Sequence, residues 1–530
     1  MLFTSYSFIG FAVFILFAYY LLPKKCQWML LLLASYIFYF IAGPEYIIYI
    51  VVTTVTTYFS ACRIEKNASR QSEYLKSAGK ELSKEEKKLY KEKQKHIRSR
   101  WKIAGILINI IILATVKYSN FLISNVNDIL GAFGSTEKLS FVTMILPLGI
   151  SFYTFQAIGY LIDVCRGTVH AERNLFKYAL FISFFPQLVQ GPISRFGELS
   201  KTLYSKHNFN GKELCFGLQR ILWGFFKKLV IADRILAGVS TIMGDVDTYN
   251  GAYAFVGMIL YTLQLYADFT GGIDITIGIA QTFGIKIMEN FNRPYFSKSL
   301  KEYWRRWHIS MCSWFRDYIF YPVSSSRLMQ KFTKVSRKYL GGTIGKHLPV
   351  YISSFVVWFS TGIWHGASWN FIVWGMANWF ILMISEELEP VYLKFHNRFK
   401  MSKKFTYRLF QTGRTFLLIC CLNLFDCYSS VADTLKALGS VFTADNWNVL
   451  WNGELLKIGL TMEDYFIILS GAVILLVVSI IQRSGSIRNK ISKKPYPVKY
   501  IIWFGLFITV LLAGAYGAGY DSSQFIYNRF

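Results

Sequence analysis

The stretch Trp304-Arg-Arg-Trp-His-Ile-Ser310 decides how this chain is interpreted, together with Gly362-Ile-Trp-His-Gly-Ala-Ser368 further along. Eight of the 14 tryptophans and three of the 7 histidines lie between residues 301 and 380. Two of those histidines, His308 and His365, stand in strongly apolar and aromatic surroundings. Because ionisable side chains are costly in such surroundings, both histidines are candidate functional residues.

The composition outside this stretch is that of a membrane protein. The 530 residues are 53% hydrophobic and only 17% charged, whereas a soluble protein is usually about one quarter charged. Residues 347–385 contain no Asp, Glu, Lys or Arg. About thirteen apolar runs occur, and several exceed the roughly 18 residues needed to cross a bilayer. We therefore predict an all-α, polytopic membrane protein in which some of these runs are re-entrant or interfacial rather than spanning.

The net charge of +27 comes mainly from loops between the apolar runs. Residues 63–100 hold thirteen Lys and Arg against six Asp and Glu. Cytoplasmic loops carry this excess and attract anionic lipids, so membrane lipids and not nucleic acid are the expected partner. The loop is predicted to be a cytoplasmic helical hairpin or solvated helix. Three spans precede it, which places the N-terminus outside, and residues 1–22 are expected to be a retained span.

The block 298–323 differs from a span because charges recur every few residues among its aromatic side chains. Trp304, Trp307, Trp314 and Tyr318 follow helical spacing through Met311. Such a segment lies in the membrane interface or enters the protein partway. An aromatic belt that only anchors the chain is the alternative, and spacing alone does not choose between them. Spacing likewise leaves open whether His365 ends a helix near the interface or lines a buried cavity.

Several kinds of site are not supported by the motifs. The eight cysteines form no CxxC pair, so a disulfide framework or a zinc ribbon is not expected. The chain has no HExxH metal motif and no Gly-x-Ser-x-Gly elbow, so neither a metal site nor a Ser-His-Asp triad is expected. Asp268 and Asp274 lie six residues apart in an apolar segment, where they are expected to hold helices together.

Six motifs in this order resemble those of the membrane-bound O-acyltransferase (MBOAT) family, and most closely its bacterial alginate O-acetyltransferase type. The likeness covers nearly the whole chain, because the tail from Tyr516 to Tyr527 is also similar. The motifs are Pro186-Gln-Leu-Val-Gln-Gly-Pro-Ile193, Tyr266-Ala-Asp-Phe-Thr-Gly271, Glu289-Asn-Phe-Asn-Arg-Pro-Tyr295, Trp304-Arg-Arg-Trp-His308, Trp314-Phe-Arg-Asp-Tyr318 and Trp364-His-Gly-Ala367.

The resemblance implies a fold and an activity. It implies a bundle of about 11–13 membrane helices around a central funnel or tunnel. The whole chain, 1–530, would be one transmembrane domain, with a catalytic core at 286–385 and C-terminal helices at 386–530. Enzymes of the family move an acyl group from a cytoplasmic thioester to a hydroxyl. By motif, His365 matches the catalytic histidine, and His308 matches the second active-site histidine.

The chemistry of these residues is compatible with acyl transfer. An imidazole titrates near neutral pH and can take the proton of an attacking hydroxyl. His308 would orient the donor or polarise its carbonyl. Arg305 and Arg306 would hold donor phosphates, or contact only lipid headgroups. The remaining candidates for supporting roles are Asn290, Arg293, Asp268, Asp317, Trp304 and Trp364.

The expected function is therefore O-acetylation of an extracellular or cell-wall polysaccharide. The donor would be acetyl-CoA or a carrier-protein thioester, no cofactor is expected to stay bound, and an extracellular SGNH-type acyltransferase is the expected partner. D-alanyl transfer to teichoic acid is the alternative, which the long C-terminal third and the tail disfavour. A polysaccharide exporter or channel would need pore-lining charges on several spans. Departures from the family pattern at 269–274 and 321–326 leave the acceptor open.

Overall fold

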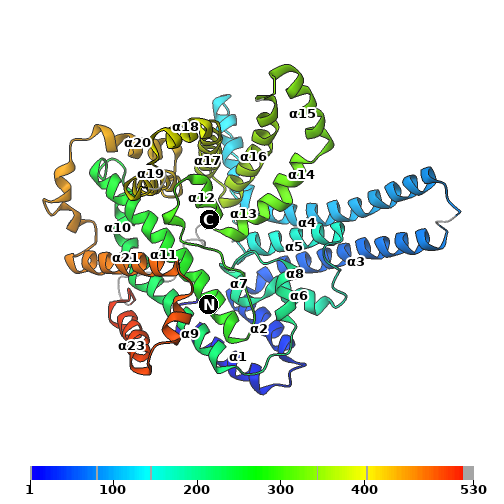
Figure 1. The fold of residues 1–530 in the computed structure, drawn as a ribbon, viewed down its shortest axis with the longest axis horizontal. Helices are drawn as coiled ribbons and strands as arrows, with labels where there is room; N and C mark the ends of the chain where they lie inside the picture. The colour runs from blue at the N-terminus through cyan, green and yellow to red at the C-terminus, as the bar shows by residue number, and fades with distance from the viewer. Residues whose placement is uncertain (1–2, 79–80, 144–145, 343, 402–403, 517–530) are drawn as a thin grey trace. The chain divides into compact units, whose positions relative to one another are not determined.

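The computed structural model describes residues 3–78, 81–143, 146–342, 344–401 and 404–516. Every regular element in these residues is a helix, as Figure 1 shows, which confirms the predicted all-α class. The chain forms two compact units, one of residues 3–215 with 279–288, the other of 216–278 with 289–530. That the whole chain acts as one domain stays a prediction. The tail motif beyond Tyr516 lies outside the described residues.

The first unit is built from the N-terminal helices. Its elements are α1 (Tyr6–Leu21), α2 (Gln27–Ala42), the 3-10 turn η1 (Pro44–Tyr46), α3 (Ile47–Ser77), α4 (Lys84–Ala132), α5 (Ile150–Arg166), α6 (Leu175–Ser183), α7 (Phe185–Leu188), α8 (Phe196–Leu203) and the beginning of α9 (Gly211–Phe225).

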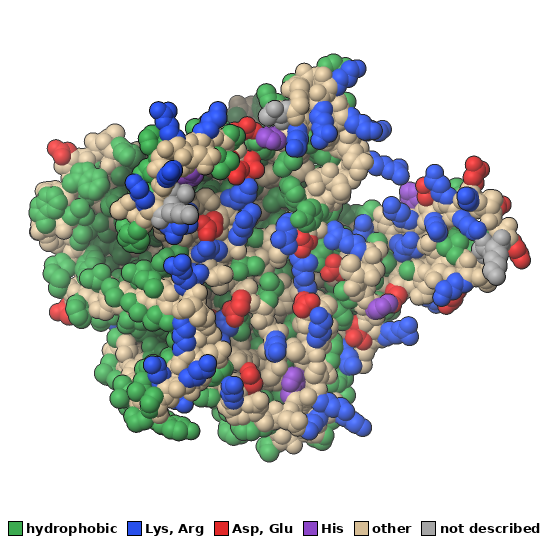
Figure 2. Space-filling view, in the orientation of Figure 1, with side chains coloured by type: hydrophobic (Ala, Val, Ile, Leu, Met, Phe, Trp, Pro, Cys, Tyr) green, Lys and Arg blue, Asp and Glu red, His purple; other side chains and the backbone are tan. Residues whose placement is uncertain are grey.

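Helices α3 and α4 lie side by side as a long hairpin, which confirms the helical hairpin predicted for residues 63–100 (Figure 1). Helix α4 has 49 residues and so extends for about 74 Å, far more than the hydrocarbon thickness of about 30 Å. Its first turn is closed by a capping box between Ser83 and Glu86. Many Lys and Arg side chains, mixed with fewer Asp and Glu, lie along the outer part of the hairpin in Figure 2. The buried amide of Asn109 donates to Thr57 Oγ1 at 3.2 Å and joins the two helices nearer their apolar end.

Except for the last four residues of α11, which belong to the first unit, the second unit holds the end of α9 and the remaining elements. They are η2 (Phe226–Ala232, π-helical), α10 (Asp233–Gly244), α11 (Ala252–Thr282), η3 (Pro294–Phe296), α12 (Leu300–Arg306), α13 (Ile309–Phe315), η4 (Arg316–Phe320, π-helical), α14 (Tyr321–Ser324), α15 (Arg327–Leu340), α16 (Ile344–His365), α17 (Trp369–Glu387), α18 (Glu389–Phe399), α19 (Phe405–Asn423), η6 (Leu424–Asp426), α20 (Val431–Thr443), η7 (Trp447–Leu450), η8 (Glu454–Lys457), α21 (Met462–Gln482), α22 (Ile487–Ser492) and α23 (Tyr496–Ala513).

Helices α9 and α11 approach closely within the second unit because glycines face each other. A Cβ on Gly224 would lie 2.6 Å from the Gly271 carbonyl oxygen, and one on Gly271 would lie 3.0 Å from the Gly224 oxygen. Directly after this contact the helix widens into the π-helix η2, which carries Lys227 and Lys228 into the interior. π-Helical turns are rare and often mark functional or strained positions.

Four helices in the described residues are long and apolar enough to cross a membrane, and the bent pair α17–α18 would make a fifth. The four are Pro44–Ser77, Lys84–Ala132, Met462–Gln482 and Tyr496–Ala513. Apolar side chains of α21 such as Phe466 and Leu469 are exposed, which suits a lipid-facing surface. The protein is therefore a multi-pass membrane protein, and the figure of 11–13 membrane helices stays a prediction.

Candidate active site

The segment expected to lie in the interface is broken at His308. Helix α12 ends at Arg306 and α13 begins at Ile309, and His308 between them has φ 45° and ψ 54°. This left-handed conformation is unfavourable for any residue except glycine and is often kept at functional sites. The apolar spacing from Trp304 to Trp314 predicts a continuous helix there, so the break is a departure from the sequence expectation.

Asn290 holds the broken segment in place. Its backbone oxygen accepts the Ile309 N–H at 3.0 Å, and its side-chain oxygen accepts both the N–H and the Oγ–H of Ser310 at 2.9 Å. Asn290 is fully buried, so these bonds are shielded from water. Asn290 thus fixes the two residues that follow His308.

The His308 side chain is completely buried among aromatic rings. Its ring centroid lies 4.9 Å from that of Phe269 on α11 and 6.1 Å from that of Trp364 on α16. Burial lowers the pKa of His308 to about 3, because the charged imidazolium is not solvated there. His308 is consequently a neutral imidazole throughout the physiological pH range.

His365 is the last residue of α16, one of the two places that the sequence left open. After His365 the chain turns into α17, and α16 and α17 pack closely against each other at two glycines. A Cβ on Gly362 would lie 2.5 Å from the Phe371 oxygen, and one on Gly375 would lie 2.5 Å from the Trp358 oxygen. The half-buried His365 ring lies 5.1 Å from Trp364 and 4.6 Å from Trp374, measured between ring centroids.

Beside His365 lies a small cavity within the second unit. It offers about 20 Å³, enough for one water molecule. Its walls are mainly aromatic and include Trp304, Trp307 and Trp374, and its polar lining residues besides the aromatic rings are His365, Asn423 and Asp426. The Trp304 indole is held by a hydrogen bond from its Nε1 to Asn378 Oδ1 at 3.0 Å. The structure thus brings Trp304 and His365 to one cavity, and places both His308 and His365 beside the Trp364 indole.

The three arginines near the histidines lie in different settings. Arg305 is exposed. Arg306 forms an ion pair with Glu302 at 2.6 Å, and its Nη1 donates to the Arg293 oxygen at 3.4 Å. Arg293 has φ 48°, the same left-handed conformation as His308. These contacts make Arg306 and Arg293 part of the support of α12, while the Arg305 side chain is directed to the surface.

The acidic candidates do not line the cavity. Asp268 binds Lys228 at 2.6 Å, and Asp274 binds Lys227 at 2.6 Å and Arg220 at 2.8 Å. These buried pairs join α11 to the α9–η2 segment, as expected for carboxylates that hold helices together. Asp317 lies on η4 and pairs with its neighbour Arg316 at 2.8 Å.

The sequence analysis missed Asp426, Asn423 and Trp374. A signal for Asp426 was present, because it is a single carboxylate in the apolar run 408–428, where a charge is costly. Trp374 and Asn423 carried no such signal. Among the described residues, no group of three or more His, Cys, Asp or Glu side chains is arranged as ligands for a metal ion.

Comparison with known proteins places this site in a family context. The family model described as MBOAT, membrane-bound O-acyltransferase family, matches residues 170–336. The chain is 33% identical to the probable alginate O-acetylase of Pseudomonas aeruginosa over 70% of this chain and 63% of that protein. It is 30% identical to the peptidoglycan O-acetyltransferase of Helicobacter pylori over 74% of this chain and 70% of that protein.

A more distant match is the teichoic acid D-alanyltransferase of Bacillus subtilis, 29% identical over 43% of this chain and 56% of that protein. The matched region spans about 63% of the length of the alginate O-acetylases of Pseudomonas aeruginosa and Azotobacter vinelandii. The identity and coverage together, added to the ordered motifs, establish the relationship: the chain belongs to the membrane-bound O-acyltransferase family.

Proposed function

We propose that this protein is an O-acyltransferase that moves an acetyl group from a cytoplasmic thioester across the membrane for O-acetylation of an extracellular or cell-wall polysaccharide. The observation that carries the proposal is the grouping of His308, Trp364 and His365, with a water-sized cavity beside His365. Relatives named for alginate and peptidoglycan O-acetylation support acetyl as the group transferred.

In the proposed reaction His365 is the general base. Its imidazole takes the proton of the acceptor hydroxyl while the hydroxyl oxygen attacks the thioester carbonyl carbon. The carbon–sulfur bond then breaks, and the proton passes from His365 to the leaving thiolate. The products are an ester and a free thiol, so no oxidant or cofactor is consumed. General-base catalysis of this kind contributes about 10²–10⁴-fold to the rate.

His308 serves a different role in this proposal. Because it stays neutral, it can donate one N–H to the carbonyl oxygen of the thioester without carrying a charge. Its buried position and fixed backbone hold the ring in one orientation. The donor is acetyl-CoA or a carrier-protein thioester. Arg305, which is exposed, is the arginine available to the phosphates that both donors carry.

The test compares His365→Ala and His308→Ala with wild type in cells, measuring ester-linked acetyl on the cell-envelope polysaccharide. His170→Ala is the matched control, because the His170 side chain is 97% exposed. Both site variants should lose nearly all acetylation at equal membrane abundance, and the control should keep it. Full acetylation by the His365 variant would refute the proposal.

The same samples separate the alternative functions. Ester-linked D-alanine that depends on His365, in place of acetate, would assign the activity to D-alanyl transfer. A polysaccharide that reaches the surface only with this protein, and reaches it equally with His365→Ala, would indicate an exporter. Loss of acetylation after deletion of a co-expressed SGNH-type protein would support a partner that completes the transfer.

We also propose that the hairpin end is cytoplasmic and the N-terminus external. Residues 84–100 are rich in exposed Lys and Arg, as the positive-inside tendency requires of a cytoplasmic segment. Alkaline phosphatase inserted after residue 80 should be inactive, and green fluorescent protein inserted there should fluoresce. An active phosphatase at this position would reverse the orientation.

A further inference from the structure

Asp426 places a carboxylate in the cavity that His365 lines. It is the last residue of η6, the short turn that follows α19, and lies 61 positions after His365. Among the described residues that line the cavity, Asp426 is the one with a carboxylate. The other polar side chains there are His365, Asn423 and the ring groups of Tyr303 and the tryptophans.

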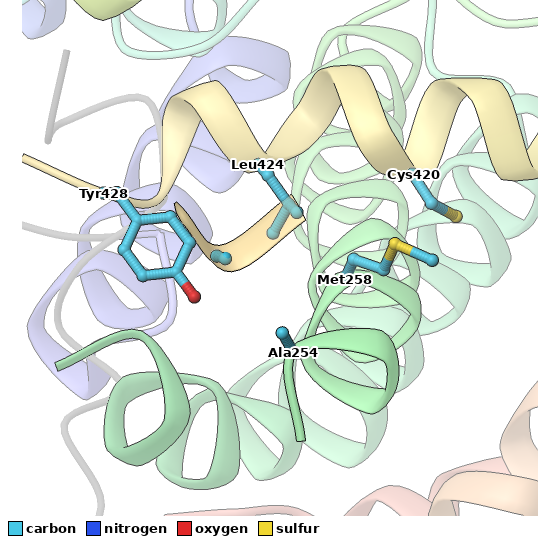
Figure 3. Packing of buried hydrophobic residues seen from close by; sticks show 6 residues of the cluster. Ala254, Met258, Cys420, Leu424 and Tyr428 are labelled. Carbon is cyan, nitrogen blue, oxygen red and sulfur yellow. The ribbon is translucent and has the colours of Figure 1, made fainter. Parts of the chain in front are cut away.

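The turn that carries Asp426 is firmly fixed. Figure 3 shows Cys420, Leu424 and Tyr428 packed against Ala254 and Met258 of α11. Leu424 and Cys420 are fully buried. Asn423, one turn before Asp426, donates from Nδ2 to Thr262 Oγ1 at 3.2 Å. A residue between such anchors has little freedom to turn its side chain away from the cavity.

The packing of η6 does not itself need a carboxylate. No described N–H or O–H donates a hydrogen bond to Asp426, and no described Lys or Arg forms an ion pair with it, unlike Asp268 and Asp274. An unbonded carboxylate beside aromatic rings is costly. The cavity has room for one water, which can accept from a protonated nitrogen and donate to a carboxylate at once. The geometry therefore couples Asp426 to His365.

We propose that Asp426 is the positioning residue of His365, in a proposal that rests on His365 being the base. Its carboxylate holds the imidazole N–H through the bridging water, so the other ring nitrogen faces the acceptor hydroxyl unprotonated. When His365 takes the hydroxyl proton, the carboxylate stabilises the imidazolium. Burial raises the pKa of Asp426 to about 8, and the imidazolium beside it favours the ionised carboxylate, so the proton goes on to the thiolate and not to Asp426.

The other described residues that line the cavity do not supply a carboxylate. Tyr303 on α12 is the remaining titratable group that lines the cavity. The contacts from α17 are the rings of Phe371 and Trp374, and those from α11 are Leu265 and Phe269. His308 is buried beside Trp364 and is neutral. Among the described residues that line the cavity, Asp426 is thus the one carboxylate available to His365.

The test replaces the carboxylate and follows His365 directly. Exchange of the imidazole C2 hydrogen for deuterium, read by mass spectrometry on the full-length protein in nanodiscs, gives the pH midpoint of His365 without any turnover. Asp426→Asn should lower that midpoint by about one pH unit or more, because an anion nearby favours the imidazolium. Asp445→Asn, which removes an exposed carboxylate of the same unit, should leave it unchanged.

Acetylation in cells provides the second readout. Asp426→Asn should lower the ester-linked acetyl made per protein by about 10²-fold or more, and Asp426→Glu, which keeps the charge, should recover at least about tenfold over Asn. If the Asn variant does not accumulate, Asp426→Ser, which also removes the carboxylate, decides by its midpoint. A midpoint lowered by about one pH unit supports the role, and a midpoint equal to that of wild type refutes it.

The two proposals fail in different ways. An unchanged exchange midpoint in Asp426→Asn overturns the positioning role whatever happens to acetylation. Full acetylation by His365→Ala overturns the proposed base, even where the midpoint shifts as expected. A merely structural Asp426 would lower the thermal unfolding temperature of both the Asn and the Glu variant and leave the midpoint of the folded protein where it was.

Discussion

The side-chain oxygen of Asn290 accepts two hydrogen bonds from Ser310, one from its N–H and one from its hydroxyl, each 2.9 Å long. Both residues are buried, and they lie twenty positions apart in the sequence. The pair closes the strained turn at His308, so the orientation of that histidine depends on an amide outside its own helices.

Replacing Asn290 by Ala should therefore impair both stability and activity. The N–H and the hydroxyl of Ser310 would both lose the acceptor that Asn290 provides, at a cost of about 1–3 kcal/mol. Thermal unfolding of the detergent-purified protein and acetylation in cells measure the two effects. Asn292→Ala is the matched control, because that side chain is exposed and its structural bond comes from the backbone. Equal unfolding temperatures for both variants would contradict the role of Asn290.

The left-handed backbone at His308 predicts an unusual order of stability. His308→Gly and His308→Ala both remove the ring, but only glycine adopts φ 45° without strain. The Gly variant should be more stable than the Ala variant by about 1 kcal/mol, although neither should support acetylation. In an ordinary helix the order is reversed, so an Ala variant that is the more stable one would show that the strain is absent.

Burial of His308 predicts a pH effect on stability. Its pKa falls to about 3 in the folded protein, compared with about 6.5 in an unfolded chain. At pH values between these two pKa values, His308 is protonated in the unfolded chain but not in the folded protein. The free energy of unfolding therefore decreases as pH falls below about 6.5. Unfolding temperatures at pH 7 and pH 5 measure this decrease. It should be smaller in His308→Phe, and an identical decrease in His308→Phe and wild type would rule out this origin.

The glycine contacts of α16 and α17 predict sensitivity to a single methyl group. Gly375→Ala should separate the helices, because its Cβ would lie 2.5 Å from the Trp358 oxygen, and His365 at the end of α16 would move with them. We expect at least a tenfold loss of acetylation. Gly413→Ala on α19 is the control, because nothing lies within 4 Å of its Cβ. That variant should be as active as wild type and slightly more stable.

Much of the fold followed from local patterns in the sequence. The hairpin of α3 and α4 was predictable because charge and length distinguish a solvated helix from a span. For His365 the sequence left two places open, a helix end near the interface and a buried cavity, and the structure has it at the end of α16 beside a small cavity. The buried pairs of Asp268 and Asp274 followed from the cost of a charge among apolar residues.

The break at His308 and the place of Asp426 could not be predicted in the same way. Aromatic spacing runs through residue 308 without interruption, and the bonds that stop the helix come from Asn290. Asp426 comes to the cavity beside His365 through the packing of α19 and η6 on α11. This is a tertiary contact, and it produces no periodic pattern in the sequence. Both features depend on residues distant in the chain, and spacing reports only on near neighbours.

The two lysines of the π-helix η2 have a consequence for how the protein is made. Lys227 and Lys228 find their carboxylates on α11 and at Asp233. Asp274, which pairs with Lys227, and Asp268, the second carboxylate of Lys228, are synthesised some 40 residues later. Burial of the two lysines therefore requires α11, so η2 and α11 are expected to fold together, as one cooperative step of biogenesis.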